Sequence, residues 1–474
     1  MQLYGRLPSL ERLGWSFTIR VLLVAYLLFY IAVALLRPDQ TFHLNLLTIL
    51  LGLSVGAFMF PGVSLAVGIL SLSVSPQNFL VVDRFVSENF SALGMQALQK
   101  FFILFTMLPA VFRYGLRPKW NMGIVAVTLL LLMSLVLSTR YPSLTILQMF
   151  KTLIGYVITF AYFSLIINKR WIEPTLLLVA LMPIISIALG AVAELGGWQA
   201  IDGRLWTVVA TDSGSHVYRL QGINIAPALA FHCYLALFVS FYQAVFRKKE
   251  VYYAILVVTL IALVLTGTRT PLLASIIVLS IGTLLATPKD VRGSSKFIII
   301  LVGTTLLAVA LAFYWPSLEE RFSASANYGE SGINTSGRNV IWQVMLNAYN
   351  GNQIFGRGLG TGAILLLDQD DKNLVHAAAA HNEYLHFLVD GGMVGLTIFI
   401  LGLGYMFVSE CRGVSASSGR YFAAFFLSFA IYSFTDNTLS GAPTVVLFYA
   451  LYLIFIQAKL EERQSLRKLD YESR

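Results

Sequence analysis

The chain has 474 residues, of which 57% are hydrophobic and only 12% are charged, and its mean hydropathy is +0.74. Soluble domains carry about 25% charged residues, so this composition excludes a soluble protein. The net charge of +9 would suggest nucleic-acid binding in a soluble protein. In this chain it is better explained by basic cytoplasmic loops, and no nucleic-acid partner is expected.

Apolar segments of membrane-spanning length recur along the chain. The candidate spans are 21–36, 44–60, 63–74, 97–112, 122–138, 144–167, 175–192, 223–246, 251–266, 272–286, 297–314, 392–408, 421–434 and 444–458. The pair separated by Pro61-Gly62 is short, so we expect about twelve to fourteen transmembrane helices. The sequence therefore predicts an all-α, polytopic helical bundle embedded in a lipid bilayer.

The basic residues predict the topology of this bundle through the positive-inside rule. With the N-terminal arginines inside, the later even-numbered connections should be basic, and they are: 113–119, 169–170, 247–249, 289–296, 412–420 and the tail 459–474. Both termini are therefore expected to be cytoplasmic, and two large segments, 195–222 and 315–391, to lie outside. This divides the chain into a membrane bundle (1–314), a large outer loop (315–391) and C-terminal membrane helices with a cytoplasmic tail (392–474).

Several arginines fall on the predicted outer side, where the positive-inside rule does not explain them. Arg269 lies in the short turn 266–271 between two spans, and Arg219 lies at the outer mouth of the span that follows it. Either could anchor the protein to lipid headgroups. A planar guanidinium beside a helix N-terminus would also bind a phosphate. Arg204 and Arg338 are further arginines on this side.

His381 lies where the large outer loop returns to the membrane. A histidine can accept a proton from a hydroxyl when a neighbouring group orients its ring, and Glu383, Asp390 and Asp436 are candidates for that neighbour. A solvated loop histidine is the alternative interpretation. His381 and His386 are five residues apart and would point to different faces of a helix, so we expect no metal site.

The glycine-rich segment 358–362 resembles a phosphate loop in composition. It lacks the flanking strand and the Lys-Ser/Thr pair of a nucleotide site. We therefore expect no nucleotide and no cofactor there.

Four sequence elements, taken together, resemble those of bacterial O-antigen ligases and the related O-antigen and exopolysaccharide polymerases. In chain order they are Arg219-Leu-Gln-Gly222; Arg269-Thr-Pro-Leu-Leu273; Gly337-Arg-Asn-Val-Ile-Trp342 with Phe355-Gly-Arg-Gly-Leu-Gly360; and His381-Asn followed, after nine intervening residues, by Gly392-Met-Val-Gly395. The resemblance extends from about 204 to 436, whereas the N-terminal third matches only as a string of spans. It implies a helical membrane bundle like those of C-type glycosyltransferases, with one large periplasmic loop.

The resemblance also implies a function. The protein would be a metal-independent, inverting glycosyltransferase that takes a glycan from an undecaprenyl-diphosphate-linked donor at the periplasmic face of the bacterial inner membrane. Arg219 and Arg269 would hold the donor diphosphate and His381 would act on the acceptor hydroxyl, with Asp436 near the same pocket. Further substrate contacts are expected from Arg204, Arg338, Asn382 and Glu383.

Three functions fit this interpretation. A ligase would move the glycan onto lipid A-core or another glycan, and the histidine element favours it. A polymerase would join two lipid-linked repeat units and would use the same donor site. A flippase or transporter for lipid-linked oligosaccharides would tend to show internal repeats, and the sequence has none. A chain-length regulator or a flippase would be a natural partner.

Overall fold

The computed structural model describes seven stretches of the chain and four single residues. These are 169–196, 205–210, 216–285, 338–350, 354–362, 380–439 and 443–472, together with residues 25, 132, 312 and 365. Apart from those single positions, the predicted spans at 21–36, 44–60, 63–74, 97–112, 122–138, 144–167 and 297–314 lie outside the described residues. Arg204 lies outside them as well.

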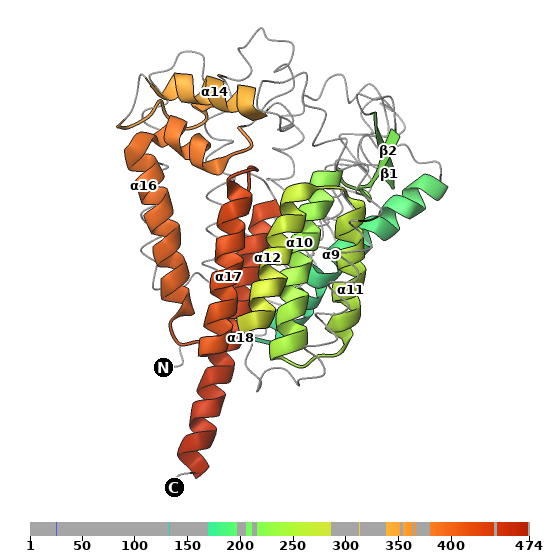
Figure 1. Cartoon of the computed structure of the whole chain (residues 1–474). Coiled ribbons are helices and arrows are strands. Elements are labelled where there is room, and N and C mark those ends of the chain that lie inside the picture. The colour runs from blue at the N-terminus through green and yellow to red at the C-terminus, as the bar shows by residue number, and fades with distance from the viewer. Residues whose placement is uncertain are drawn as a thin grey trace.

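Helices dominate the described residues, as the hydropathy pattern predicts. In chain order they are α9 (Ile172–Leu195) after a 3₁₀ turn η2 (Lys169–Trp171), α10 (Ala226–Phe241) with its π-helical continuation η3 (Tyr242–Phe246), α11 (Val251–Leu265), α12 (Arg269–Leu285), α14 (Arg338–Tyr349), α16 (Glu383–Cys411), α17 (Ala416–Ser433) and α18 (Pro443–Glu472). In Figure 1, α10, α11, α12 and α17 stand upright in the bundle, and α14 lies across the upper end of α16.

Three of the described helices are long and apolar enough to cross a membrane: Ile172–Leu195, Ala226–Phe246 and Glu383–Cys411. Two shorter apolar helices, Val251–Leu265 and Arg269–Leu284, lie between the second and third of these along the chain. The chain is therefore a predominantly helical integral membrane protein. The total number of spans, and the side of the membrane on which each loop lies, stay predictions.

A small β-hairpin adds to the all-helical fold that the sequence predicts. Strands β1 (Trp206–Ala210) and β2 (His216–Leu220) pair antiparallel, with Thr207 opposite Arg219. Both segments contain the β-branched and aromatic residues that favour strands, and the residues between them include Asp, Ser and Gly. The hairpin lies at the upper end of the bundle, and its second strand carries one of the candidate arginines (Figure 1).

Aromatic side chains pack α10 against α17 in the middle of the bundle. The rings of Phe238 and Phe425 lie 3.9 Å apart, and the Phe238 carbonyl accepts a hydrogen bond of 2.9 Å from the Tyr421 hydroxyl. Tyr234 stacks on Phe425, and its hydroxyl lies 2.7 Å from that of Ser428. These buried contacts fix α10 beside α17, and with it the turns above both helices.

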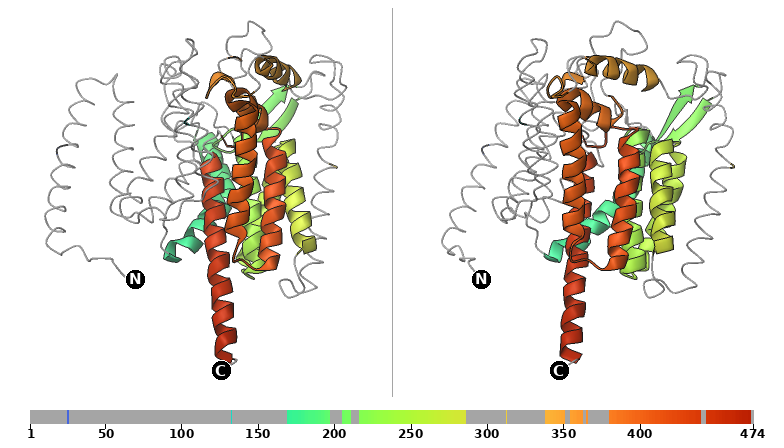
Figure 2. Two further views of the ribbon diagram at one scale, coloured as in Figure 1. Left: turned by 90° about the vertical axis from the view of Figure 1, so that its left-hand side faces the viewer. Right: turned by 60° about the vertical axis from the view of Figure 1, so that its left-hand side comes forward.

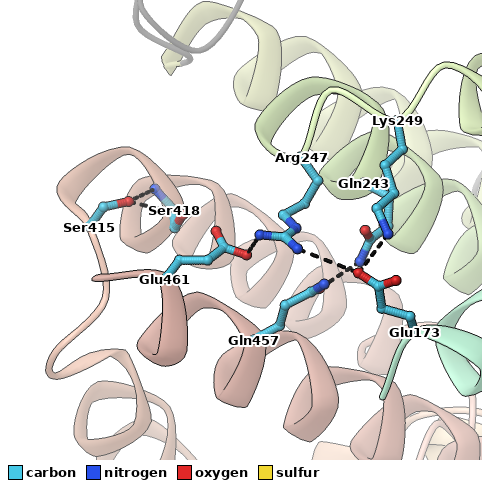
Figure 3. A network of polar contacts seen from close by, with 8 residues as sticks. All are labelled: Glu173, Gln243, Arg247, Lys249, Ser415, Ser418, Gln457 and Glu461. Carbon is cyan, nitrogen blue, oxygen red and sulfur yellow. Dashed lines mark hydrogen bonds and ion pairs between the residues drawn. The ribbon is translucent and has the colours of Figure 1, made fainter. Parts of the chain in front are cut away.

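A polar network joins the start of α9, the end of η3 and the middle of α18 (Figure 3). Arg247 pairs with Glu461 and lies 3.5 Å from Glu173, which also accepts a 2.6 Å contact from Lys249. Next to it, the Gln243 amide donates to Gln457 at 2.6 Å. Partly exposed ion pairs add little stability, so the main effect of the network is to align these three segments with one another.

Candidate functional site

Arg219 on strand β2 reaches the turn between α11 and α12. Its Nε donates to the Thr266 carbonyl at 2.8 Å, and its Nη2 donates to Thr268 Oγ1 at 2.9 Å. Thr268 directly precedes Arg269 in the chain. The structure therefore brings the two candidate phosphate-binding arginines, which are fifty residues apart in sequence, to the same turn.

A close contact between two glycines holds the end of the hairpin against helix α9. Gly222, with a φ of +63°, lies against α9, and a Cβ on Gly190 would come within 2.5 Å of the Gly222 carbonyl carbon. The next amide, that of Ile223, donates to the Ser186 carbonyl at 3.0 Å. Only residues without a side chain permit this approach, so the glycine of the Arg219-Leu-Gln-Gly222 element serves to position the arginine.

Helix α12 begins at Arg269, so this arginine occupies the first helical position rather than the middle of a turn. Pro271 follows two residues later, where the missing N–H breaks no helical hydrogen bond. A helix N-terminus carries a partial positive charge, and a cation there is unfavourable by about 0.3–1 kcal/mol. With Arg219 beside it, this end of α12 is an electropositive site that favours an anion.

A threonine pair connects the start of α12 with the turn between α17 and α18. Thr435 Oγ1 donates to Thr270 Oγ1 at 2.9 Å. The next residue, Asp436, places its Oδ1 3.3 Å from Nδ1 of His381. The arginines and the histidine are thus connected by hydrogen bonds and short chain segments that run from strand β2 to the helix ends beside it.

His381 and Asp436 form the pair that a proton-accepting histidine needs. Of the three carboxylates that the sequence offered as its neighbour, Asp436 is the one in contact with the ring. The His381 side chain is 43% exposed and that of Asp436 is 29% exposed, so the pair is open to a ligand. Because Nδ1 faces the carboxylate, Nε2 is the nitrogen available to a substrate.

His381 holds a backbone conformation that non-glycine residues seldom adopt, with a φ of +48°. Contacts on both sides stabilise it: Trp342 Nε1 donates to the Ala380 carbonyl at 3.1 Å, and Asn382 caps α16 by accepting from the Leu385 amide at 3.1 Å. Such a conformation costs on the order of 1–3 kcal/mol and is often found at functional sites. The backbone that carries the imidazole is therefore held in place on both sides, and Asp436 contacts the ring itself.

With this geometry established, the chain can be compared with known proteins. Residues 254–400 match the family model described as O-antigen ligase. This match supports a relationship of the segment to the O-antigen ligase/polymerase superfamily. The matched segment includes Arg269, Arg338 and His381, whereas Arg219 and Asp436 lie outside it and reach it through the contacts described above. No curated protein matches the chain.

Two other candidates in the O-antigen ligase domain have structural partners. Asn382 is the cap of α16, and the buried Glu383 accepts from the Leu439 amide at 2.6 Å through Oε1. Tyr384 adds a bond from its hydroxyl to the Ala430 carbonyl at 2.9 Å. These contacts dock the start of α16 on the α17–α18 turn, which is how His381 meets Asp436. In this structure the two residues have a positioning role, and a substrate contact by either stays a prediction.

Arg338 begins α14, the helix that lies over α16 in the O-antigen ligase domain. The same helix reaches the residue before His381 through Trp342, whose Nε1 donates to the Ala380 carbonyl. A substrate contact by Arg338 stays a prediction. Arg204 lies outside the described residues.

The glycine-rich segment of the O-antigen ligase domain binds a carboxylate of the protein itself. The amides of Gly360 and Gly362 donate to the two oxygens of Asp390 at 2.7 and 3.1 Å. His386 Nδ1 lies 3.9 Å from the same carboxylate. The phosphate-like composition of this loop therefore reflects a nest of amides around the Asp390 side chain, which the sequence alone did not reveal.

Gly392 produces a kink in α16 on which this loop docks. It has φ and ψ of 65° and −165°, and a Cβ at this position would lie 2.3 Å from the Ile354 carbonyl oxygen. Gly356, with a φ of +73°, approaches the same kink from the loop side. The glycine in the His381-Asn-x9-Gly392 element is thus required by backbone packing.

Proposed function

We propose that this protein is a membrane glycosyltransferase that moves a glycan from an undecaprenyl-diphosphate-linked donor to an acceptor hydroxyl. One observation carries the proposal. Three hydrogen bonds, Arg219–Thr268, Thr435–Thr270 and His381–Asp436, link the candidate arginines to the candidate proton acceptor through residues that are close neighbours in the chain. The match of residues 254–400 to the O-antigen ligase family model supports this type of reaction.

The arginines would bind the donor diphosphate. When the bond between the anomeric carbon and the phosphate oxygen breaks, the diphosphate leaves with the electron pair and gains negative charge. Guanidinium groups at fixed positions stabilise that charge more strongly than water does, because they need no reorganisation during the reaction. Arg219 is held by two hydrogen bonds to the residues just before Arg269, so its guanidinium is fixed beside the start of α12 before a donor binds. This accounts for the proposed independence from a metal ion.

His381 would activate the acceptor. Its Nε2 takes the proton of the attacking hydroxyl while the hydroxyl oxygen bonds to the anomeric carbon, and Asp436 stabilises the imidazolium that forms. Attack from the face opposite the diphosphate inverts the anomeric centre. We further propose that Arg338 and Arg204 contact the substrates and that the reaction takes place at the periplasmic face of the inner membrane, with both termini cytoplasmic.

The test is glycan transfer by the purified protein in detergent or nanodiscs, with an undecaprenyl-diphosphate-linked oligosaccharide as donor and a chelator present. Product on lipid A-core identifies a ligase, and product on a second lipid-linked oligosaccharide identifies a polymerase. If neither forms while the donor crosses the bilayer of a proteoliposome, the protein is a flippase and the proposal is wrong.

Conservative substitutions test the arginines in the same assay. Arg219→Lys and Arg269→Lys keep the charge but lose the two-pronged contact with phosphate oxygens, which should reduce transfer by roughly a hundredfold. Arg420→Lys is the matched control, because Arg420 is exposed on α17 at the opposite end of the bundle. Normal transfer by both site variants would make the arginines lipid anchors.

A further inference from the structure

Phe434 is a large apolar side chain that lies exposed beside the candidate site. It follows the last residue of α17, two positions before Asp436, and it is 51% exposed. Scattered apolar residues on a surface need no explanation, but an exposed aromatic ring at a rigid, polar site often marks a place where a ligand binds. None of the steps proposed for the transfer reaction uses this side chain.

Two further rings fix the position of Phe434. The Trp342 ring meets it edge to face, with centroids 5.5 Å apart and an interplanar angle of 67°, and the Tyr384 ring lies 6.3 Å away. Both neighbours have their polar atoms bound to backbone carbonyls, Trp342 to that of Ala380 and Tyr384 to that of Ala430. The aromatic surface is therefore formed in advance, and a ligand would not have to order it.

The surface formed by Phe434, Trp342 and Tyr384 is connected to His381 both along the chain and through space. Along the chain, Phe434 is separated by one residue from Asp436, whose carboxylate contacts the imidazole. Through space, Trp342 binds the carbonyl of Ala380, the residue that precedes His381. A molecule resting on Phe434 would therefore lie next to the group proposed to take the acceptor proton.

We propose that Phe434 is the platform on which a pyranose ring of the acceptor glycan stacks, with Trp342 as its wall. This inference rests on the proposed function. One face of a pyranose presents C–H groups, which carry partial positive charge and are attracted to the negative face of an aromatic ring. Its hydroxyl groups need hydrogen-bonding partners at the edge.

The polar surroundings favour a sugar over a hydrocarbon chain. Arg338 lies four residues before Trp342 and so shares a face of α14 with it, and the half-exposed His381 follows Ala380, whose carbonyl accepts from Trp342. An acyl or isoprenoid chain offers no hydrogen-bonding group to the guanidinium or the imidazole, whereas sugar hydroxyls can accept from the first and donate to the second. The site thus offers an aromatic face for the C–H groups of a sugar and polar groups for its hydroxyls, and a lipid tail could use only the first.

The experiment compares four purified proteins in nanodiscs: wild type, Phe434→Leu, Phe434→Tyr and Phe355→Leu. Phe355 is the matched control because it is also an exposed phenylalanine, at 52%, on the loop that docks at the α16 kink. The probes are the water-soluble oligosaccharides released from lipid A-core and from the lipid-linked repeat unit. Saturation-transfer NMR measures which sugar C–H protons contact the protein, and the transfer assay gives KM for the acceptor.

We expect Phe434→Leu to weaken binding of one of the two oligosaccharides and to raise the KM for the matching acceptor by roughly three- to tenfold, with kcat nearly unchanged. Phe434→Tyr should restore both values, and Phe355→Leu should resemble wild type. A wild-type protein that binds a sugar through Phe434 but transfers no glycan would refute the proposed reaction and support the platform. Transfer with an unchanged KM in Phe434→Leu would overturn the platform, and a change only in thermal stability would make Phe434 a membrane-interface residue.

Discussion

Replacing Asp436 by asparagine tests how much the His381–Asp436 contact contributes to catalysis. Asparagine keeps an oxygen for the Asn437 amide, which donates to Asp436 Oδ1 at 2.8 Å, so the turn should persist. The charge, however, is lost. At the 3.3 Å that separates His381 Nδ1 from Asp436 Oδ1, a full ion pair is worth about 1 kcal/mol in water and about 5 kcal/mol at an effective dielectric constant of 20.

Both side chains are partly exposed to water, so the interaction energy lost with the charge should lie nearer to the lower of these two values. We expect Asp436→Asn to lose about 2 kcal/mol of transition-state stabilisation, or roughly thirtyfold in kcat, with the KM for the lipid-linked donor unchanged. This is a smaller effect than a buried catalytic carboxylate would give. The assay is steady-state glycan transfer by protein whose folded fraction has been measured.

A double-mutant cycle tests the reasoning itself. If Asp436 acts through His381, then Asp436→Asn should have little further effect once His381 is alanine, because the group that it stabilises is gone. Equal losses in both backgrounds would show that Asp436 acts independently of the histidine. A kcat for Asp436→Asn close to that of the wild type would refute the role of the pair altogether.

Three further predictions concern the backbone, the threonine pair and the topology. Gly392→Ala should yield little folded protein, since its Cβ would collide with a carbonyl oxygen, whereas Gly404→Ala in the same helix has open space and should fold normally, as a thermal melt would show. Thr435→Val should lower kcat without loss of folded protein, and Thr435→Ser should restore it; equal activity in both would remove the threonine bridge from the mechanism. In a cysteine-free background, a membrane-impermeant thiol reagent should label a cysteine at Ser336 but not one at Ser465 in intact cells, and the reverse pattern would contradict the proposed orientation.

The sequence predicts the described helices of this protein well because a run of consecutive apolar residues indicates a span without any knowledge of its tertiary contacts. The observed α11 ends within one residue of its predicted limit, and α9 and α17 extend their predicted spans by a few residues at one or both ends. Arg219 and Arg269 could also be singled out from the sequence, because the positive-inside rule does not explain them. The resemblance to the O-antigen ligase/polymerase superfamily, stated from four short elements, is supported by the match to residues 254–400.

The partners of individual side chains could not be predicted. Glu383, two residues from His381, turns inward to Leu439, and Asp390 accepts from the glycine loop. The carboxylate that reaches the imidazole comes from 55 residues away, across the packing of α16 on α17. Sequence proximity is a poor guide here because neighbouring residues on a helix end point in different directions.

Helix α18 has a practical consequence for further study of this protein. It comprises 30 residues and is therefore about 45 Å long, whereas the hydrocarbon core of a bilayer is about 30 Å thick. Its end projects well beyond the other described helices, as Figure 2 shows. A folded domain fused in helical register to this projection would be carried rigidly at a fixed distance from the bundle. It would supply the asymmetric mass outside the detergent belt that particle alignment in electron cryo-microscopy requires for a protein of 52.4 kDa.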